Sequence, residues 1–476
     1  MKTETKITFY SGLDTIGGVV MEIIYRKSRV ILEMGRTYNL DYNLYDGNVN
    51  RRNSYIKDGI WTNDILKIDG LYEQKDIKDL DLLPAEKSIF RTAIFITHLH
   101  LDHMGNMGIV SNDIDVYLSK NAQIIEKALE DIGDGIYSKR NYYLDIPKEV
   151  YIEDIYVKSF CLNPNSYQDY SFLIETPDLK IHYTGDVIVN GVYGPNIIKE
   201  AKFLREKEID ILVCEGTGFL ASWLEKTTRY EKEIFPSYKP LKGVITEERL
   251  LERTQHLIDN YDGLIIFNYY GREMCHAKNW FDFAKNSART LVFEPKSAYI
   301  LNRFFNESYN VMIPDTYKDS NYPGYLKQVI KDNNIINKQE VLSNPGNYLV
   351  QNTFENILEL LDYRNTKTMY LHHSGVPLGN YDPQFKNFEM ILNKANITYK
   401  HIYEGEDGEF FSHATANQIS WYINEVNAKL LIPVHCSQRK LMAETSKTNY
   451  YLCNQNETYV YNHQTKQLEV DSWKLK

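Results

Sequence analysis

The residues best suited to chemistry stand together in one short stretch of this 476-residue chain. Thr97-His98-Leu99-His100-Leu101-Asp102-His103 holds three histidines and one aspartate within six positions. A single histidine is more often a surface or core residue than a ligand, because imidazole serves many roles. Clustered imidazoles repel one another when protonated unless a cation orders them. The stretch therefore predicts a metal site, and imidazole together with carboxylate suits Zn²⁺ or Mn²⁺.

Motifs further along the chain extend this pattern. The HxHxDH stretch resembles the signature of the metallo-β-lactamase fold, and Tyr183-Thr184-Gly185-Asp186 is similar to the second metal motif of that superfamily. Three more segments resemble motifs of its β-CASP branch, the nucleases that include ribonuclease J and the mRNA 3′-end processing endonuclease. These segments are Leu212 to Thr217 with Glu215, Phe411 to Thr415 with His413, and Pro433-Val434-His435. In this order, the motifs carry the resemblance over most of the chain.

The resemblance implies a ligand set for one or two ions, Zn²⁺ or Mn²⁺, with Mg²⁺ as an alternative. The six residues that it assigns to metal binding are His98, His100, Asp102, His103, Asp186 and His435. In the first site, the family adds another histidine to His98, His100 and Asp186. In the second site, Asp102, His103, Asp186 and His435 complete the set.

The chain departs from the family at that additional histidine. The matching text begins Asn163-Pro164-Asn165, and the histidine position is Pro164, whose side chain has no donor atom. Asn163 or Asn165 could supply an amide oxygen, which suits Mn²⁺ or Mg²⁺ better than Zn²⁺. Two alternatives are an enzyme that works with one ion in the second site, and a pseudo-enzyme that keeps only the fold.

The resemblance also implies roles in phosphodiester hydrolysis. Asp102 would orient the attacking hydroxide, and His413, poised by Glu215, would bind the scissile phosphate or protonate the leaving oxygen. Ser412 and Arg272 are candidate substrate contacts. The expected substrate is single-stranded nucleic acid, RNA before DNA, in the cleft between two domains. The competing functions are a small-molecule metallo-hydrolase on the same fold and an RNA-binding protein without activity.

The elements that must position these residues alternate between strands and helices. Strands are expected at Lys180 to Tyr183, Asp210 to Cys214 and Leu430 to Val434, each ending beside a motif. Between them, Gly263 to Phe293 has a βαβ rhythm, which predicts a parallel sheet. The expected fold is α/β, an αββα metallo-β-lactamase sandwich with an inserted α/β β-CASP domain. The expected boundaries are 1–220 and 401–476 for the sandwich and 221–400 for the insert.

Composition limits the remaining possibilities. A net charge of −10 excludes binding of a polyanion by bulk charge, so nucleic acid would need a local basic groove or a metal. The five cysteines show no CxxC pair, which fits unpaired thiols in a reducing compartment. The start lacks the apolar core of a signal peptide, and no uncharged run is long enough to cross a bilayer. We therefore expect a cytoplasmic protein with no membrane partner, and leave open a homodimer.

Overall fold

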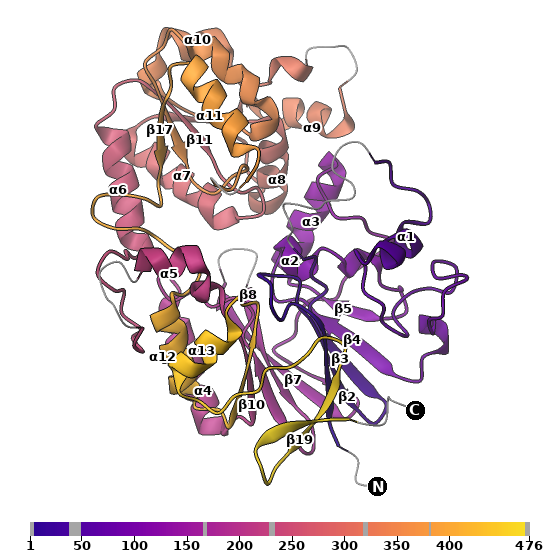
Figure 1. Ribbon diagram of the computed structural model, residues 1–476. Coiled ribbons are helices and arrows are strands. Elements are labelled where there is room, and N and C mark those ends of the chain that lie inside the picture. Colours follow the sequence, from indigo (N-terminus) through magenta and orange to yellow (C-terminus); the bar gives the residue numbers. More distant parts are fainter. Residues whose placement is uncertain are drawn as a thin grey trace.

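The structure is a computed structural model that describes residues 4–37, 49–164, 169–227, 234–317, 322–379 and 382–471. These residues form two bodies, a two-sheet sandwich and a second body that we call the insert, residues 247–401 (Figure 1). Asn165, one of the two candidate amide ligands, lies outside the described residues.

The sandwich consists of two mixed sheets that receive strands from both ends of the chain. Sheet 1 has the order β20-β19-β1-β2-β3-β4-β5, and sheet 2 has the order β18-β10-β9-β8-β7-β6. The strands of sheet 1 are β1 (Lys6–Ser11), β2 (Val20–Tyr25), β3 (Ser28–Leu32), β4 (Arg91–Phe95), β5 (Asp115–Tyr117), β19 (Thr458–Asn462) and β20 (Gln467–Val470). Those of sheet 2 are β6 (Glu149–Ile152), β7 (Ile155–Asn163), β8 (Asp169–Glu175), β9 (Lys180–Tyr183), β10 (Ile211–Glu215) and β18 (Leu430–Val434).

Alternating apolar side chains bury both faces of each sheet. In β10, Ile211 and Val213 join the core between the two sheets, whereas Leu212 and Cys214 face the helices outside. Successive side chains of a strand point to opposite faces, so a continuous apolar run fits a strand covered on both sides. The helices of the sandwich are α1 (Tyr55–Thr62), α2 (Leu101–Met104), α3 (Lys120–Ile132), α4 (Gly194–Lys207), α5 (Ala221–Thr227), α12 (Ala416–Val426) and α13 (Arg439–Ser446). The result is the expected αββα sandwich.

The insert is built on a third sheet, in which every strand pair is parallel. Its order is β14-β13-β12-β15-β11-β16-β17, and helices lie on both of its faces. The strands are β11 (Leu264–Asn268), β12 (Thr290–Phe293), β13 (Asn310–Val311), β14 (Asn334–Ile335), β15 (Tyr348–Gln351), β16 (Thr368–His372) and β17 (Thr398–His401). The helices are α6 (Glu247–Asp259), α7 (Met274–Ser287), α8 (Pro295–Phe305), α9 (Gly324–Asp332), α10 (Lys338–Ser343) and α11 (Phe385–Lys394). The expected parallel sheet is confirmed, while the domain boundaries at residues 220 and 400 stay a prediction.

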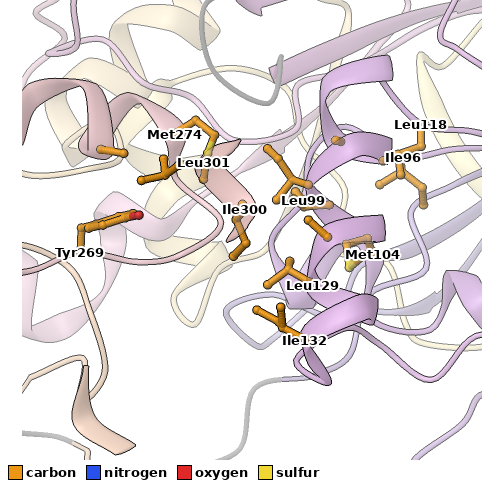
Figure 2. Packing of buried hydrophobic residues seen from close by; sticks show 14 of the residues in the cluster. Ile96, Leu99, Met104, Leu118, Leu129, Ile132, Tyr269, Met274, Ile300 and Leu301 are labelled. Carbon is orange, nitrogen blue, oxygen red and sulfur yellow. The ribbon is translucent and has the colours of Figure 1, made fainter. Parts of the chain in front are cut away.

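Packed apolar side chains join the insert to the sandwich. Leu129 and Ile132 of α3 belong to the same buried cluster as Ile300 and Leu301 of α8, and Figure 2 shows Ile300 on the side of α8 that faces α3. Because burial of apolar surface is favourable, this contact favours one fixed arrangement of the two bodies. None of the helices among the described residues combines the length and apolar character needed to span a bilayer.

Candidate metal centre

The HxHxDH stretch follows β4 and is held by the backbone of the N-terminal strands. The amide of Gly18 donates to the carbonyl of Asp102 at 2.8 Å, and the amide of Met34 donates to that of His103 at 2.9 Å. Gly35 packs so closely here that a Cβ atom would lie 1.8 Å from the Asp102 carbonyl oxygen. Any side chain at this glycine would therefore displace the loop that carries the histidines.

Residues from four other segments reach this loop. Asp186 follows β9, Glu215 ends β10, His413 precedes α12, and His435 follows β18. The β10–β18 parallel pair, with Glu215 opposite Val434, aligns the ends of these two strands. Side chains at the carboxyl ends of adjacent parallel strands share one edge of the sheet, which explains the convergence.

The distances between candidate donor atoms are short. His435 Nε2 lies 3.1 Å from Asp102 Oδ2, and His103 Nε2 lies 3.2 Å from Asp186 Oδ1. On the other side of Asp186, His98 Nε2 lies 3.3 Å from Oδ2. All six residues assigned to metal binding from the sequence therefore meet at one place, because His100 Nδ1 also lies 3.0 Å from His98 Nε2.

Hydrogen bonds on the far side of each ring determine its tautomer. The Thr97 hydroxyl donates to Glu33 and must therefore accept from His98 Nδ1, which lies 2.9 Å away. His103 Nδ1 donates to Glu33 Oε1 at 3.1 Å. These assignments place the Nδ1 protons away from the centre and direct Nε2 of both rings toward it.

Glu33, which follows β3, is completely buried, and sequence reasoning missed it. The sequence shows this glutamate only as the end of a short strand. Its position beside Thr97 and His103 depends on the parallel pairing of β3 with β4.

Among the buried side-chain atoms that lack a hydrogen-bond partner within the described residues, two belong to the second site. They are His103 Nε2 and Asp186 Oδ1. Burial by itself lowers the pKa of His103, but the carboxylates of Asp186, Asp102 and Glu33 outweigh it and raise the pKa well above its usual value. Unsatisfied buried polar atoms are costly, so a nitrogen and a carboxylate oxygen without partners fit a cation between them. The residues present therefore fit a metal ion in the second site.

The first site has a similar demand for positive charge. His98 Nε2 and His100 Nδ1 face each other at 3.0 Å, while His98 Nδ1 contacts Thr97 and His100 Nε2 contacts a carboxylate. With protons on the outer nitrogens, a further proton or a metal ion must lie between the inner two. Two nitrogens bonded to one Zn²⁺ lie about 3.3 Å apart, since each bond is about 2.0–2.1 Å and the angle is near tetrahedral. The observed separation is close to that value.

The carboxylate that contacts His100 comes from the insert. Glu273, in the loop between β11 and α7, has its Oε1 2.7 Å from His100 Nε2. Burial alone lowers the pKa of His100, but the hydrogen bond and charge of Glu273 reverse this and raise it. No motif in the sequence marks Glu273, because its contact arises only from the docking of the insert on the sandwich.

The position of the missing histidine offers oxygen atoms instead. Pro164 is exposed on the turn after β7. The neighbouring Asn163 pairs across the sheet with Asp169, and Asn163 Oδ1 and Asp169 Oδ2 are both buried without a partner among the described residues. Burial, with the negative charges of Glu273 and Asp186, raises the pKa of Asp169 to about 7. Asp169 was not a candidate from the sequence, since the family pattern drew attention to residues 163–165.

His413 and Glu215 form a pair at the edge of the centre. Glu215 Oε1 lies 3.3 Å from His413 Nδ1, and His413 Nε2 lies 3.6 Å from Asp186 Oδ2. Burial lowers the pKa of His413, but the charges of Asp186 and Glu215 outweigh it and raise the pKa to about 9. Ser412, the neighbouring candidate for substrate binding, is exposed. The pair therefore places a protonated imidazole beside the candidate ligands.

Arg272 does not fit its expected contact with substrate. Its guanidinium Nη1 lies 2.6 Å from Glu126 Oε2 of α3, and the two side chains are 6% and 2% exposed. A guanidinium paired in this way inside the interface is not offered to a nucleic acid backbone. The physical reason is that a buried carboxylate without a partner is costly, so Glu126 holds the guanidinium in the interface.

Comparison with known proteins supports the fold. The chain is 21% identical over 448 residues to ribonuclease J of Mycoplasma pneumoniae and 20% identical over 458 residues to ribonuclease J of Mycoplasma genitalium, covering 91% of this chain and 68% of each relative. A crystal structure of a protein of unknown function from Enterococcus faecalis V583 superposes with a TM-score of 0.73 at 23% identity, over 96% of this chain and 100% of the other. No family model matches the chain. With the topology described above, these similarities show a ribonuclease J-like fold of the metallo-β-lactamase, β-CASP type.

Proposed function

We propose that this protein is a metal-dependent phosphodiester hydrolase that cleaves single-stranded nucleic acid, with RNA favoured over DNA as the substrate. The observation that carries the proposal is the convergence of His98, His100, Asp102, His103, Asp186 and His435. Within the part of the chain that the structure describes, His103 Nε2 and Asp186 Oδ1 have no hydrogen-bond partner, and they lie 3.2 Å apart. Similarity to two ribonucleases J supports nucleic acid as the substrate. The insert contributes Glu273 beside His100, so we place the substrate where insert and sandwich meet.

The second site would hold one ion through Asp102, His103, Asp186 and His435, and the first would hold another through His98, His100 and Asp186. Zn²⁺ or Mn²⁺ is the expected ion, with Mg²⁺ as the alternative. A metal ion bound there supplies a Lewis acid and lowers the pKa of water from 15.7 toward about 7.

Asp102 would orient the attacking water. Its carboxylate is a quarter exposed, whereas His103 and His435 beside it are buried. Burial raises the pKa of Asp102, but His103 and the hydrogen bond from His435 outweigh this and lower it below its usual value. An ionised carboxylate at the open side of the centre accepts a hydrogen bond from the water and aligns it with phosphorus.

His413 would act on the other side of the phosphate as general acid. Glu215 holds Nδ1, and the raised pKa of the ring keeps a proton on Nε2 at neutral pH. When the water oxygen bonds to phosphorus and the P–O bond to the leaving sugar breaks, Nε2 delivers that proton to the leaving oxygen. Glu215 also accepts the amides of Val187 and Thr217, so it is fixed in place while it orients the ring.

Cleavage of 5′- and 3′-labelled single-stranded RNA and DNA tests the proposal, with Mn²⁺, Mg²⁺ or Zn²⁺ added to protein of measured metal content. We expect RNA cleavage that EDTA abolishes and that Asp102→Ala reduces at least about 100-fold, since one positioned group contributes about 10²–10⁴. Asp113→Ala removes an exposed carboxylate elsewhere on the sandwich and should keep wild-type activity.

Equal cleavage by wild type and Asp102→Ala would contradict the mechanism. Metal-loaded wild-type protein that cleaves neither RNA nor DNA would refute the nuclease assignment and favour the pseudo-enzyme that the proline at position 164 suggests. Light scattering on the same samples would test the homodimer.

A further inference from the structure

A hydrogen bond from His100 Nε2 to Glu273 Oε1, at 2.7 Å, joins the insert to a candidate metal ligand. The His100 and Glu273 side chains are 26% and 12% exposed, so this bond is largely shielded from solvent. A carboxylate that accepts from one imidazole nitrogen fixes the other as the unprotonated one and raises its basicity. Here the other nitrogen is Nδ1, which faces His98 Nε2 at 3.0 Å.

Polar contacts with α3 and the residues after it anchor the Glu273 loop and the surrounding interface. The adjacent Arg272 forms the buried ion pair with Glu126 of α3, and Nη2 also donates to the carbonyl of Asp134 at 3.3 Å. Further along the same interface, the Tyr299 hydroxyl of α8 donates to Asp131 at 2.9 Å. Together with the apolar contact of α3 and α8, these bonds hold the Glu273 loop at a fixed position relative to the sandwich.

We propose that Glu273 is a positioning residue through which docking of the insert sets metal affinity at the first site. The inference rests on the proposed metal centre but not on nuclease activity. The resemblance assigns the first site a fourth ligand at the position of Pro164, whose side chain has no donor atom, so His98, His100 and Asp186 would depend more strongly on this contact. Because such coupling is reciprocal, an ion bound at the first site stabilises the docked insert in return.

Metal titrations of the full chain test the affinity. Metal-free protein is titrated with Zn²⁺ and Mn²⁺ against a chromophoric chelator, for wild type, Glu273→Ala, Glu273→Gln and the control Asp282→Asn. Asp282 is exposed on α7 and lies in the same helix that Glu273 precedes. Loss of a carboxylate partner of a metal-binding histidine costs about 10–100-fold in affinity. We therefore expect that loss for the weaker of two ions in Glu273→Ala, a smaller loss in Glu273→Gln because its amide oxygen still accepts the bond, and none in Asp282→Asn.

A double-mutant cycle separates positioning from a general structural effect. In a His100→Ala background, Glu273→Ala should cause no further loss of affinity, because the bond through which it acts is already absent. Hydrogen exchange of α3 and α8 supplies a second readout: metal should slow exchange there in wild type and do so less in Glu273→Ala. Neither measurement requires substrate.

Three results would overturn the inference. They are wild-type binding of only one ion, two-ion binding by Glu273→Ala with unchanged affinities, and an equal loss at both sites. Failure to cleave nucleic acid would leave the titrations interpretable, so the two proposals fail separately.

Discussion

Glu33→Gln tests whether the hydrogen bond of Glu33 to His103 Nδ1 determines how His103 presents Nε2 to the second site. The carboxylate accepts from the Thr97 amide at 3.2 Å, from the Thr97 hydroxyl, and from His103 Nδ1 at 3.1 Å. An amide offers one accepting oxygen and turns an NH₂ group toward the remaining donors. One bond to a charged group is lost, which costs about 1.5–3 kcal/mol of folding free energy.

The same substitution changes the metal site. When Nδ1 faces an NH₂ group, His103 is better accommodated with its proton on Nε2, which removes the lone pair directed at Asp186. We expect affinity for the tighter-bound ion to fall about 10–100-fold, equivalent to about 1.4–2.7 kcal/mol. Chelator competition measures this loss, and thermal unfolding with and without EDTA measures the stability.

Glu200→Gln is the matched control for a buried carboxylate. Glu200 accepts hydrogen bonds from Ser171 and Tyr422 on the outer side of sheet 2, away from the candidate ligands. It should change stability without changing metal affinity. Wild-type affinity in Glu33→Gln, or an equal affinity loss in both variants, would refute the reasoning.

Three further outcomes are expected. Pro164→His should strengthen binding of the weaker ion in the same titration, and an unchanged affinity would mean that other atoms already complete the first site. Burial raises the pKa of Glu200 from 4.5 to about 7, so the wild type should lose up to about 3 kcal/mol of stability as pH rises from about 4.5 to about 7. In chemical denaturation, Glu200→Gln should flatten this dependence of stability on pH. The same dependence in both proteins would contradict the raised pKa. Arg272→Met should destabilise the protein by about 3–5 kcal/mol, because it leaves Glu126 buried without its partner, and Glu126→Leu in the same chain should recover much of the loss; weaker RNA binding at unchanged stability would instead support the substrate contact.

The parts of the fold and site that the sequence could predict are those that depend on short, local sequence patterns. The strands that end before His98 and before His435 follow from runs of β-branched and apolar residues, whereas the short strand before Asp186 alternates polar and apolar side chains. The motifs after these strands carried the resemblance, and the structure brings their side chains within 3–4 Å of one another.

The contacts that sequence reasoning missed depend on packing between distant segments. Glu33 matters because β3 pairs with β4, and Glu273 because the insert docks on α3. The sequence around each of these residues does not distinguish it from any other glutamate in the chain. Arg272 depends on packing in the same way: the sequence offered it as a possible contact to a nucleic acid backbone, and the structure pairs it with Glu126 in the interior.

The position of β18 has a consequence for biosynthesis. This strand pairs with β10 only after the chain has left the insert, and it delivers His435 to a loop formed more than 300 residues earlier. Translation proceeds from the amino terminus, so a ribosome-bound chain that has not reached residue 430 contains most of the ligands but not the strand that closes the second site. A chain stalled at that length therefore lacks one of the four candidate ligands of the second site.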